Sequence, residues 1–363
     1  MDSQQRAYIA NFGTITAVGD SAAMTAASVK AGVSGYQLSD FYNAQQKPLT
    51  LSPVPESVFR QADIEFIIYD YYSEQYDRIL KMAFIAMQEV LEQRPEQQSI
   101  PLILAIPDIS EKDYYLDTSL LLENLLEHKE LPFTAETIHF IAGGRAAGIQ
   151  GIELAMDYLY QKGAAYVLLG SSDSYIDTAR LNKIDEAERL LASNRYDGFV
   201  AGEGAGFLLL TREPQKALQL DKHIIALNRP GYAEEPGHLY SNDAYRGEGL
   251  DKAFKMAFKY SHTQPVDVIY SSMNGEHFWA KEHGVACLRN KHFLSDNVVT
   301  EHPADCYGDL GAATGTVLIG VAAIHLLQNS RTTNQLVYAS ADTRQRAAMV
   351  MEKLCIEDVK GAQ

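Results

Sequence analysis

A glycine pair occupies the place where this chain is best suited to hold a nucleophile. Within residues 137–151, a short β-type run from Ile138 to Ile141 is followed by Gly143-Gly144 and then by a helical pattern. A helix N-terminus presents unpaired N–H groups and a partial positive charge, which together stabilise an anion. The pattern predicts a strand, a sharp turn at Gly143-Gly144, which we call the elbow, and a helix start. The hydrogen side chain of glycine, however, cannot attack a substrate.

Other residues whose side chains could take part in a reaction lie far from this turn in the sequence. Asn274 can donate a hydrogen bond to a substrate oxygen, and Asp309 can act as a base. His277 is either a third participant or a solvated loop histidine, and Cys306 is either a thiol near a helix start or a small buried apolar residue. Arg145, just after the glycine pair, is either a buried partner of an acid such as Asp309 or a surface arginine.

The elements around these residues predict an α/β protein. In the helix after the glycine pair, Ile152, Ala155, Met156 and Leu159 share one apolar face. Continuous apolar runs that alternate with helices are typical of sheets covered on both faces. The runs YVLLGSSDS and LVYASADT form a weak internal repeat, which favours a duplicated α/β unit over two unrelated α/β layers. We expect one half to cover residues 1–215 and the other residues 216–363.

Local signals predict the extent of several further elements. An N-cap at Asp20 or Ser21 predicts the first helix, and the proline-containing segment 36–57 is expected to be irregular. The other predicted helices are Asp77–Gln93, Leu120–Leu126, Arg180–Ala192 and Gly249–Tyr260, and the predicted strands include Pro101–Ile106, Ala165–Leu169, Phe199-Val200, Phe207–Leu210, His223–Leu227, Val266–Tyr270 and a final strand Leu336–Ser340.

Composition excludes several classes of function. The chain has 363 residues, of which 46% are apolar and 21% charged, and we expect that no apolar run is long enough to span a membrane. The net charge of −16 disfavours binding to nucleic acid, to anionic membranes and directly to an acidic carrier protein. The three cysteines have no metal-site spacing. We therefore expect a cytoplasmic protein with no metal and no cofactor.

One ten-residue segment carries a resemblance to a known family. Asp197 to Gly206, DGFVAGEGAG, resembles the DGFxxGEGAG signature of the β-ketoacyl-[acyl-carrier-protein] synthases. The segments 7–35 and 77–92 and Gly311-Ala312-Ala313 are also similar to parts of that family. The resemblance implies the thiolase fold, with duplicated βαβαβαββ halves in a five-layered αβαβα arrangement and a dimer across edge strands.

The catalytic residues of that family are absent at the matching positions. The nucleophilic cysteine corresponds to Gly143, or to Gly144 with a shift of one residue, and the first histidine corresponds to Asn274. Gly308 or Asp309 stands at the second histidine, and residues 341–346 replace the family's glycine-rich gate. Four parts of one catalytic apparatus are therefore missing, while the signature of the scaffold remains.

This pattern predicts a noncatalytic subunit similar to a chain length factor. Such a subunit pairs with an active ketosynthase as a heterodimer and shapes its acyl tunnel in type II fatty-acid or polyketide biosynthesis, including aryl polyene systems. It meets acyl carrier protein only indirectly, through that partner. The candidates for tunnel or interface residues are Tyr114, Tyr115, Leu120, Leu121, Leu125, Phe133 and Arg145.

Two alternatives stay open at this stage. In the first, Asn274 and Asp309 support an enzyme with altered chemistry, such as a malonyl-carrier-protein decarboxylase or a non-covalent acyltransferase. In the second, the chain is a stand-alone structural protein with no ketosynthase partner. The tunnel candidates also have a simpler interpretation as ordinary core or loop residues, because apolar residues are mostly there for packing.

Overall fold

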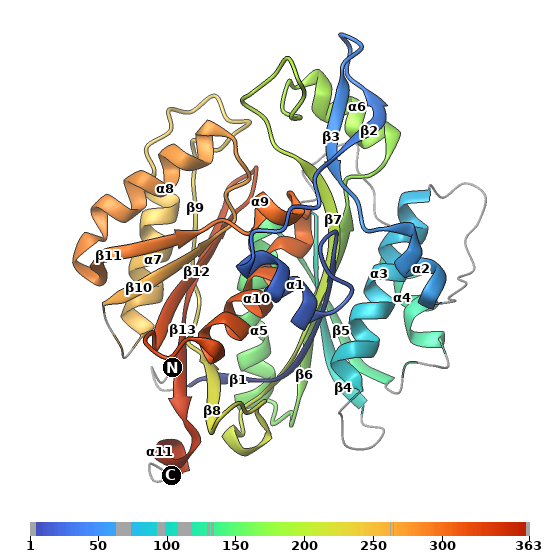
Figure 1. Ribbon diagram of the computed structural model, residues 1–363. Helices are drawn as coiled ribbons and strands as arrows, with labels where there is room; N and C mark the ends of the chain where they lie inside the picture. Colours follow the sequence, from blue (N-terminus) through green and yellow to red (C-terminus); the bar gives the residue numbers. More distant parts are fainter. Residues whose placement is uncertain are drawn as a thin grey trace.

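The fold is built from two sheets and three layers of helices (Figure 1). It is seen in a computed structural model, which describes residues 5–62, 74–92, 99–107, 118–128, 131, 134–261, 263 and 265–360. The two sheets have the same topology, which explains the weak repeat in the sequence.

The first sheet has the strand order β5-β4-β6-β7-β1. Strand β7 is antiparallel to both β6 and β1, whereas β4 is parallel to both β5 and β6. The five strands are β1 (Ala7–Thr16), β4 (Ser99–Ile106), β5 (Thr134–Ala142), β6 (Val167–Ser174) and β7 (Ala201–Thr211).

The second sheet repeats this order as β11-β10-β12-β13-β8. Strand β13 is antiparallel to both β12 and β8, and β10 is parallel to both β11 and β12. Strands β1 and β8 join the two sheets through the pairs Ala7 with Leu227 and Tyr8 with Ala226. The five strands are β8 (His223–Leu227), β10 (Val266–Ser271), β11 (Leu294–Glu301), β12 (Asn334–Ser340) and β13 (Gln345–Cys355).

Helices complete the five αβαβα layers. The central layer holds α5 (Ala147–Tyr160) and α10 (Thr314–Gln328), which contact strands of both sheets. On the outer face of the first sheet lie α3 (Glu74–Leu91) and α4 (Thr118–Glu127), and on that of the second lie α7 (Glu248–Tyr260) and α8 (His277–Arg289). The expected thiolase-like fold is confirmed. The expected boundary between residues 215 and 216 falls in the connection between β7 and β8 and remains a prediction.

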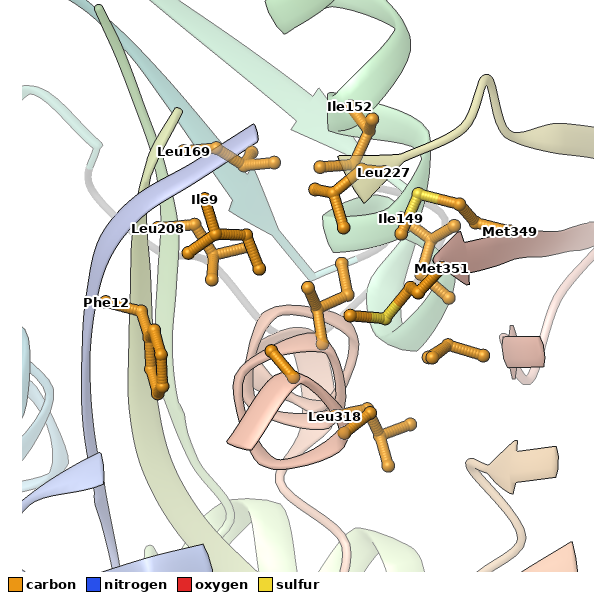
Figure 2. Close-up of a cluster of buried hydrophobic side chains, with 14 of the residues drawn as sticks. Ile9, Phe12, Ile149, Ile152, Leu169, Leu208, Leu227, Leu318, Met349 and Met351 are labelled. Carbon is orange, nitrogen blue, oxygen red and sulfur yellow. The ribbon is translucent and has the colours of Figure 1, made fainter. Parts of the chain in front are cut away.

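The central core holds the layers together. Figure 2 shows Ile9, Leu169 and Leu208 of the first sheet facing Ile149 of α5, and Met349 of the second sheet on the other side. These side chains are 2% exposed or less. Because each buried aliphatic side chain contributes roughly 1.5–3 kcal/mol, this cluster accounts for much of the cohesion between the sheets.

The remaining helices and strands lie around the five-layered core. The strands β2 and β3 form a hairpin that projects beyond the layers (Figure 1). The bounds are α1 (Ala22–Lys30), β2 (Gln37–Tyr42), β3 (Pro48–Ser52), α2 (Glu56–Ala62), α6 (Thr178–Glu186), β9 (Gly231–Glu234), α9 (Ala304–Tyr307) and α11 (Ile356–Lys360), with 3₁₀ turns at Gly144–Ala146, Pro214–Lys216, Lys291–Phe293 and Gly311–Ala313.

Local sequence signals explain where some helices begin and end. The Ser21 side chain accepts a hydrogen bond from the backbone N–H of Met24 at 3.3 Å, so Ser21 is the N-cap of α1. The predicted helix Arg180–Ala192 is shorter than expected, because α6 ends at Glu186 and Glu188 adopts φ 57°. A left-handed residue of this kind breaks an α-helix.

Long-range contacts overturn the prediction of two short strands around the glycine-rich segment. Residues 201–211 form one buried strand, β7, because its glycines leave room for close neighbours. A Cβ on Gly202 would lie 2.5 Å from the carbonyl oxygen of Tyr307, and one on Gly206 would lie 3.0 Å from the backbone nitrogen of Val317. The DGFVAGEGAG signature therefore ends in a strand that α10 and the Asp309 loop approach closely.

Three other predictions about elements were wrong. The segment 36–57 is not irregular, because it contains β2, β3 and the start of α2. The last strand is β13 rather than Leu336–Ser340, and the sequence analysis missed α8 and β11. Strand β13 has an apolar run, AAMVM, but its extended state depends on pairing with β12 and β8.

One helical segment in the described part of the chain is long and apolar enough to cross a membrane. It spans Gly311–Gln328 with a mean hydropathy of 1.5, so the expectation that no such run exists was wrong. However, 78% of this segment is buried inside the fold, where α10 forms the central layer. A core helix of a globular protein passes the same test, so the segment is weak support for a membrane span.

Candidate functional site

The four segments that correspond to the missing catalytic apparatus converge in space. The glycine pair follows β5, Asn274 follows β10, Asp309 precedes the turn before α10, and Asp342 follows β12. Asn274 lies 2.8 Å from Asp309, measured from Nδ2 to Oδ2, and Arg145 contacts both Asp309 and Asp342. The four segments therefore meet at one place, which ion pairs fill, and its role as a site remains a prediction.

Glycine conformations shape two of these segments. Gly144 adopts φ +50° and Gly308 adopts φ +79°, both in the region that favours glycine. At Gly143 a Cβ would lie 2.8 Å from Oε1 of Gln150, whose amide nitrogen donates to Gln345 at 3.0 Å. The side chain of Gln150 thus lies against the position from which a nucleophile would project.

Arg145 is the central residue of the site. Its side chain is only 3% exposed, so the surface-arginine alternative is wrong. The guanidinium donates to the carboxylate of Asp309, to Oδ1 of Asp342 at 2.5 Å and to the carbonyl oxygen of Ser340 at 2.8 Å. It also lies 4.6 Å from the centre of the Trp279 ring. Every one of these partners belongs to the second repeat.

A second arginine extends the network. Arg189 donates from Nε to Oε1 of Glu276 at 2.7 Å and from NH1 to Oδ2 of Asp342 at 2.6 Å. Its guanidinium also donates to the hydroxyl of Tyr240, a residue that is 55% exposed. The network therefore runs from the elbow to the protein surface.

The carboxylates of the network are held by several donors each. Asp309 accepts from Arg145, from Asn274 and from the backbone N–H of Gly311 at 2.9 Å. Glu276 accepts from Asn274 at 3.0 Å and from Nε1 of Trp279 at 3.0 Å. Multiple donors on a buried carboxylate offset the cost of removing it from water.

Charge in this site is nearly balanced. Two guanidiniums, Arg145 and Arg189, face the carboxylates of Asp309, Asp342 and Glu276. Burial alone would raise the pKa of Asp342, but the two arginines outweigh it and hold that pKa well below its usual range. Burial alone would lower the pKa of Arg145, but Asp309 and Asp342 raise it above its ordinary value. Asp342 and Arg145 are therefore held ionised.

Little space remains beside the network. A hollow bounded by Gly144, Arg145, Asp173, Arg180 and Asp342 has a volume of about 10 Å³. That is roughly the space of a single water molecule. Arg180 is itself paired with Asp173 at 2.8 Å, so it is not a spare cation for a ligand. The hollow has no room for an acyl group.

The two remaining chemical candidates lie outside the network. His277 is not a loop residue but the first residue of α8, and its side chain is 82% exposed, with Nδ1 2.9 Å from Oδ1 of Asp197. Cys306 is buried, and burial together with Asp305 raises the pKa of its thiol. A thiol that resists deprotonation is a poor nucleophile.

The structure describes four of the seven tunnel or interface candidates. Leu120, Leu121 and Leu125 are buried on α4 in the outer core with α3, and Arg145 lies in the network. Tyr114, Tyr115 and Phe133 lie outside the described residues. A role of the three leucines in a tunnel remains a prediction.

Within the described parts of the chain, no three His, Cys, Asp or Glu side chains are grouped so that they could hold a metal ion.

Solved structures match the fold of this chain over nearly its whole length. One is "The ishigamide ketosynthase/chain length factor", with a TM-score of 0.73 and 14% identity, covering 96% of this chain and 99% of that one. Another is a chain of the complex of the ketosynthase ApeO with its chain length factor ApeC from Xenorhabdus doucetiae, with a TM-score of 0.72, 17% identity and coverage of 97% and 99%.

The chain has the ketosynthase fold. A third structure with this fold is the apo AntDE:AntF complex, a type II polyketide synthase acyl carrier protein with its ketosynthase bound to the hexaketide. It has a TM-score of 0.73, 14% identity and coverage of 96% and 99%. The resemblance to the ketosynthase family that the glycine-rich signature indicated is thereby confirmed, and the matching structures include chain length factor complexes. No protein-family model and no curated protein matches the sequence itself.

Within this ketosynthase fold, sequence reasoning missed part of the network. Arg189, Trp279 and Tyr240 were not predicted, although Glu276 and Asp342 lie in segments that replace catalytic motifs. A usable signal was the position of acidic residues in the loops after strands: Glu276 lies in the loop after β10 and Asp342 in the loop after β12. Such residues sit at the carboxyl ends of parallel strands, where sites of α/β sheets are found.

Proposed function

We propose that this chain is a noncatalytic ketosynthase-like subunit similar to a chain length factor. It pairs with an active β-ketoacyl-carrier-protein synthase and shapes the acyl tunnel of that partner in type II fatty-acid or polyketide biosynthesis, with aryl polyene systems as one setting. It works in the cytoplasm and meets acyl carrier protein only through its partner.

The observation that carries this proposal is the filled site. A condensing enzyme needs an activated nucleophile and room for an acyl thioester. Here the elbow carries glycine, the hollow beside it is about 10 Å³, and Arg145 occupies the centre with both of its carboxylate partners. A scaffold retained around a closed site is expected of a subunit whose role depends on its surface.

The relatives by fold support the type of partner. Two of the matching structures contain a ketosynthase together with a chain length factor. By analogy, this chain would pair with a ketosynthase through the edge of its first sheet. Strand β5 lies at that edge and pairs only with β4 among the described residues.

The contacts give no support to an enzyme with altered chemistry. Asp309, the candidate base, already accepts hydrogen bonds from three donors: Arg145, Asn274 and the Gly311 N–H. Asn274 donates to Asp309 and Glu276 rather than towards an open space.

The proposal is tested by co-purification followed by reconstitution. The affinity-tagged chain is expressed in its native host, and any ketosynthase that co-purifies is produced alone and with this chain. We expect a one-to-one complex, condensation of malonyl units only when the ketosynthase is present, and a change in product length when this chain is omitted or exchanged.

Two outcomes would contradict the proposal. One is a stable homodimer that binds no ketosynthase under any condition. The other is release of carbon dioxide from malonyl-carrier protein, or uptake of its label, by the isolated chain. Tight binding of acyl carrier protein by the isolated chain at physiological salt would contradict the indirect contact proposed here.

A further inference from the structure

The outer edge of the first sheet ends in an apolar strand. Among the described residues, β5 has β4 on one side and no strand on the other. Phe140 is 39% exposed, Ile138 and Ile141 are half-buried, and Thr137 is exposed. An uncovered edge strand of nine residues is a template for pairing with another chain.

The C-terminal half of β5 is held on its inner side by the ladder with β4, which reaches Ala142, and His139 contacts Tyr158 of α5. Strand β5 stops at Ala142, and two glycines follow before Arg145. The backbone N–H of Gly143 donates to the carbonyl oxygen of Ile106, at the end of β4, and this hydrogen bond is long at 3.4 Å. Glycine has the greatest conformational freedom of any residue, so the glycine pair by itself does not fix the course of the chain where it leaves β5.

Arg145 is the first residue after β5 whose side chain is firmly bound. Its partners are Asp309, Asp342, the Ser340 carbonyl and the Trp279 ring, all of which lie in the second repeat. The edge strand of the first sheet is therefore tied through Arg145 to loops that follow β12 and precede α10.

We infer that Arg145 is a positioning residue for the partner-binding edge, holding the C-terminal end of β5 in the geometry that a ketosynthase partner recognises. The inference rests on the proposed function for the identity of the partner. It assigns the buried network a role in assembly: the residues that fill the former site also anchor the strand beside it.

A paired substitution tests the inference without leaving a charge unpaired. In Arg145→Met/Asp309→Asn the guanidinium and its main acid are both removed, while Asp342 keeps Arg189. The matched control is Arg78→Met/Glu203→Gln, a pair of similar burial between α3 and β7 with side chains 13% and 0% exposed. Arg145→Lys is the conservative variant, because lysine keeps the charge but not the planar fork.

Two readouts are measured on the full chain: affinity for the ketosynthase that co-purifies with it, and hydrogen exchange of the amides of residues 134–142. We expect Arg145→Met/Asp309→Asn to weaken association by about tenfold and to speed exchange along β5. Arg145→Lys should restore part of the affinity, and the control should change it by less than about twofold.

The outcomes separate the inference from the proposed function. Unchanged affinity and exchange in Arg145→Met/Asp309→Asn would overturn the inference, and so would an equal loss in the control, which would indicate general destabilisation. If the wild-type chain binds no ketosynthase at all, the proposed function fails. Exchange along β5 then still decides whether Arg145 anchors the strand.

Discussion

The Nε atom of Arg145 donates a hydrogen bond to the carbonyl oxygen of Ser340 at 2.8 Å. This bond joins the elbow of the first repeat to the end of β12 in the second repeat, across the central layer. A segment of the first repeat and a segment of the second are thus joined by the side chain of Arg145, which is not one of the catalytic residues of a condensing enzyme.

Removing Arg145 alone should destabilise the protein strongly. Arg145→Ala leaves Asp309 buried with no cation, and loss of one partner of a buried pair costs about 3–5 kcal/mol. Arg145→Met/Asp309→Asn removes both charges and should stay within about 1–2 kcal/mol of the wild type. Urea unfolding followed by circular dichroism measures this difference.

The single tryptophan, Trp279, provides a local probe for the same experiment. It lies 4.6 Å from the Arg145 guanidinium and donates to Glu276. Its emission should shift in both variants even where global stability is kept. Equal stability losses in the single and double variants would mean that Arg145 acts through packing on Trp279 rather than through charge.

Restoring a thiol at the elbow should not restore condensation. In Gly143→Cys the new side chain meets Oε1 of Gln150, and no histidine stands at the positions of Asn274 or Asp309. We expect no transfer of radiolabelled acyl groups above background, with Gly144→Cys as the companion variant. Stable labelling of either variant would show that the site still admits an acyl thioester.

Substitution by alanine should change the free energy of unfolding in opposite directions at two glycines. In Gly202→Ala the new Cβ lies 2.5 Å from the Tyr307 carbonyl oxygen, a backbone atom, so we expect a loss of about 1–3 kcal/mol. At Gly284, in α8, no heavy atom lies within 4 Å of the added Cβ. Gly284→Ala should stabilise the protein by about 0.5–1 kcal/mol. Thermal unfolding distinguishes them, and a neutral Gly202→Ala would contradict the close approach to β7.

Acid should weaken the fold through His283. Burial and the nearby His302 lower the pKa of His283 to about 4, while Tyr338 lies 3.0 Å from its Nδ1. The unfolded chain, with a histidine pKa near about 6.5, binds more protons than the native state between pH 4 and 6.5. Stability therefore rises with pH across this window, and the contribution of His283 is lost as pH falls through it.

The lowered pKa of His283 sets the size of its effect on the free energy of unfolding. The effect amounts to at most about 3.5 kcal/mol, since each pKa unit corresponds to about 1.4 kcal/mol. The melting temperature of the wild type, measured from pH 7 to pH 4, should fall more steeply than that of His283→Gln. Parallel curves would show that other groups dominate the acid response.

The sequence by itself determined the elements with strong local signals and the absence of the usual nucleophile. Ser21 caps α1 because its hydroxyl reaches a neighbouring N–H, and α5 follows the glycine pair because its apolar residues recur at helical spacing. The identity of residues 143, 274 and 309 is also a property of the sequence alone. These features depend on neighbours within a few positions.

Only the tertiary structure decided what fills the site and how the glycine-rich segment folds. Arg145 is buried because acids 164 and 197 positions away in the chain surround it, and no local pattern distinguishes it from a surface arginine. Likewise β7 is one strand because Tyr307 and Val317 approach its glycines. Contacts between distant residues form only when both sheets and the central helices are in place, so the physical reason lies in the fold.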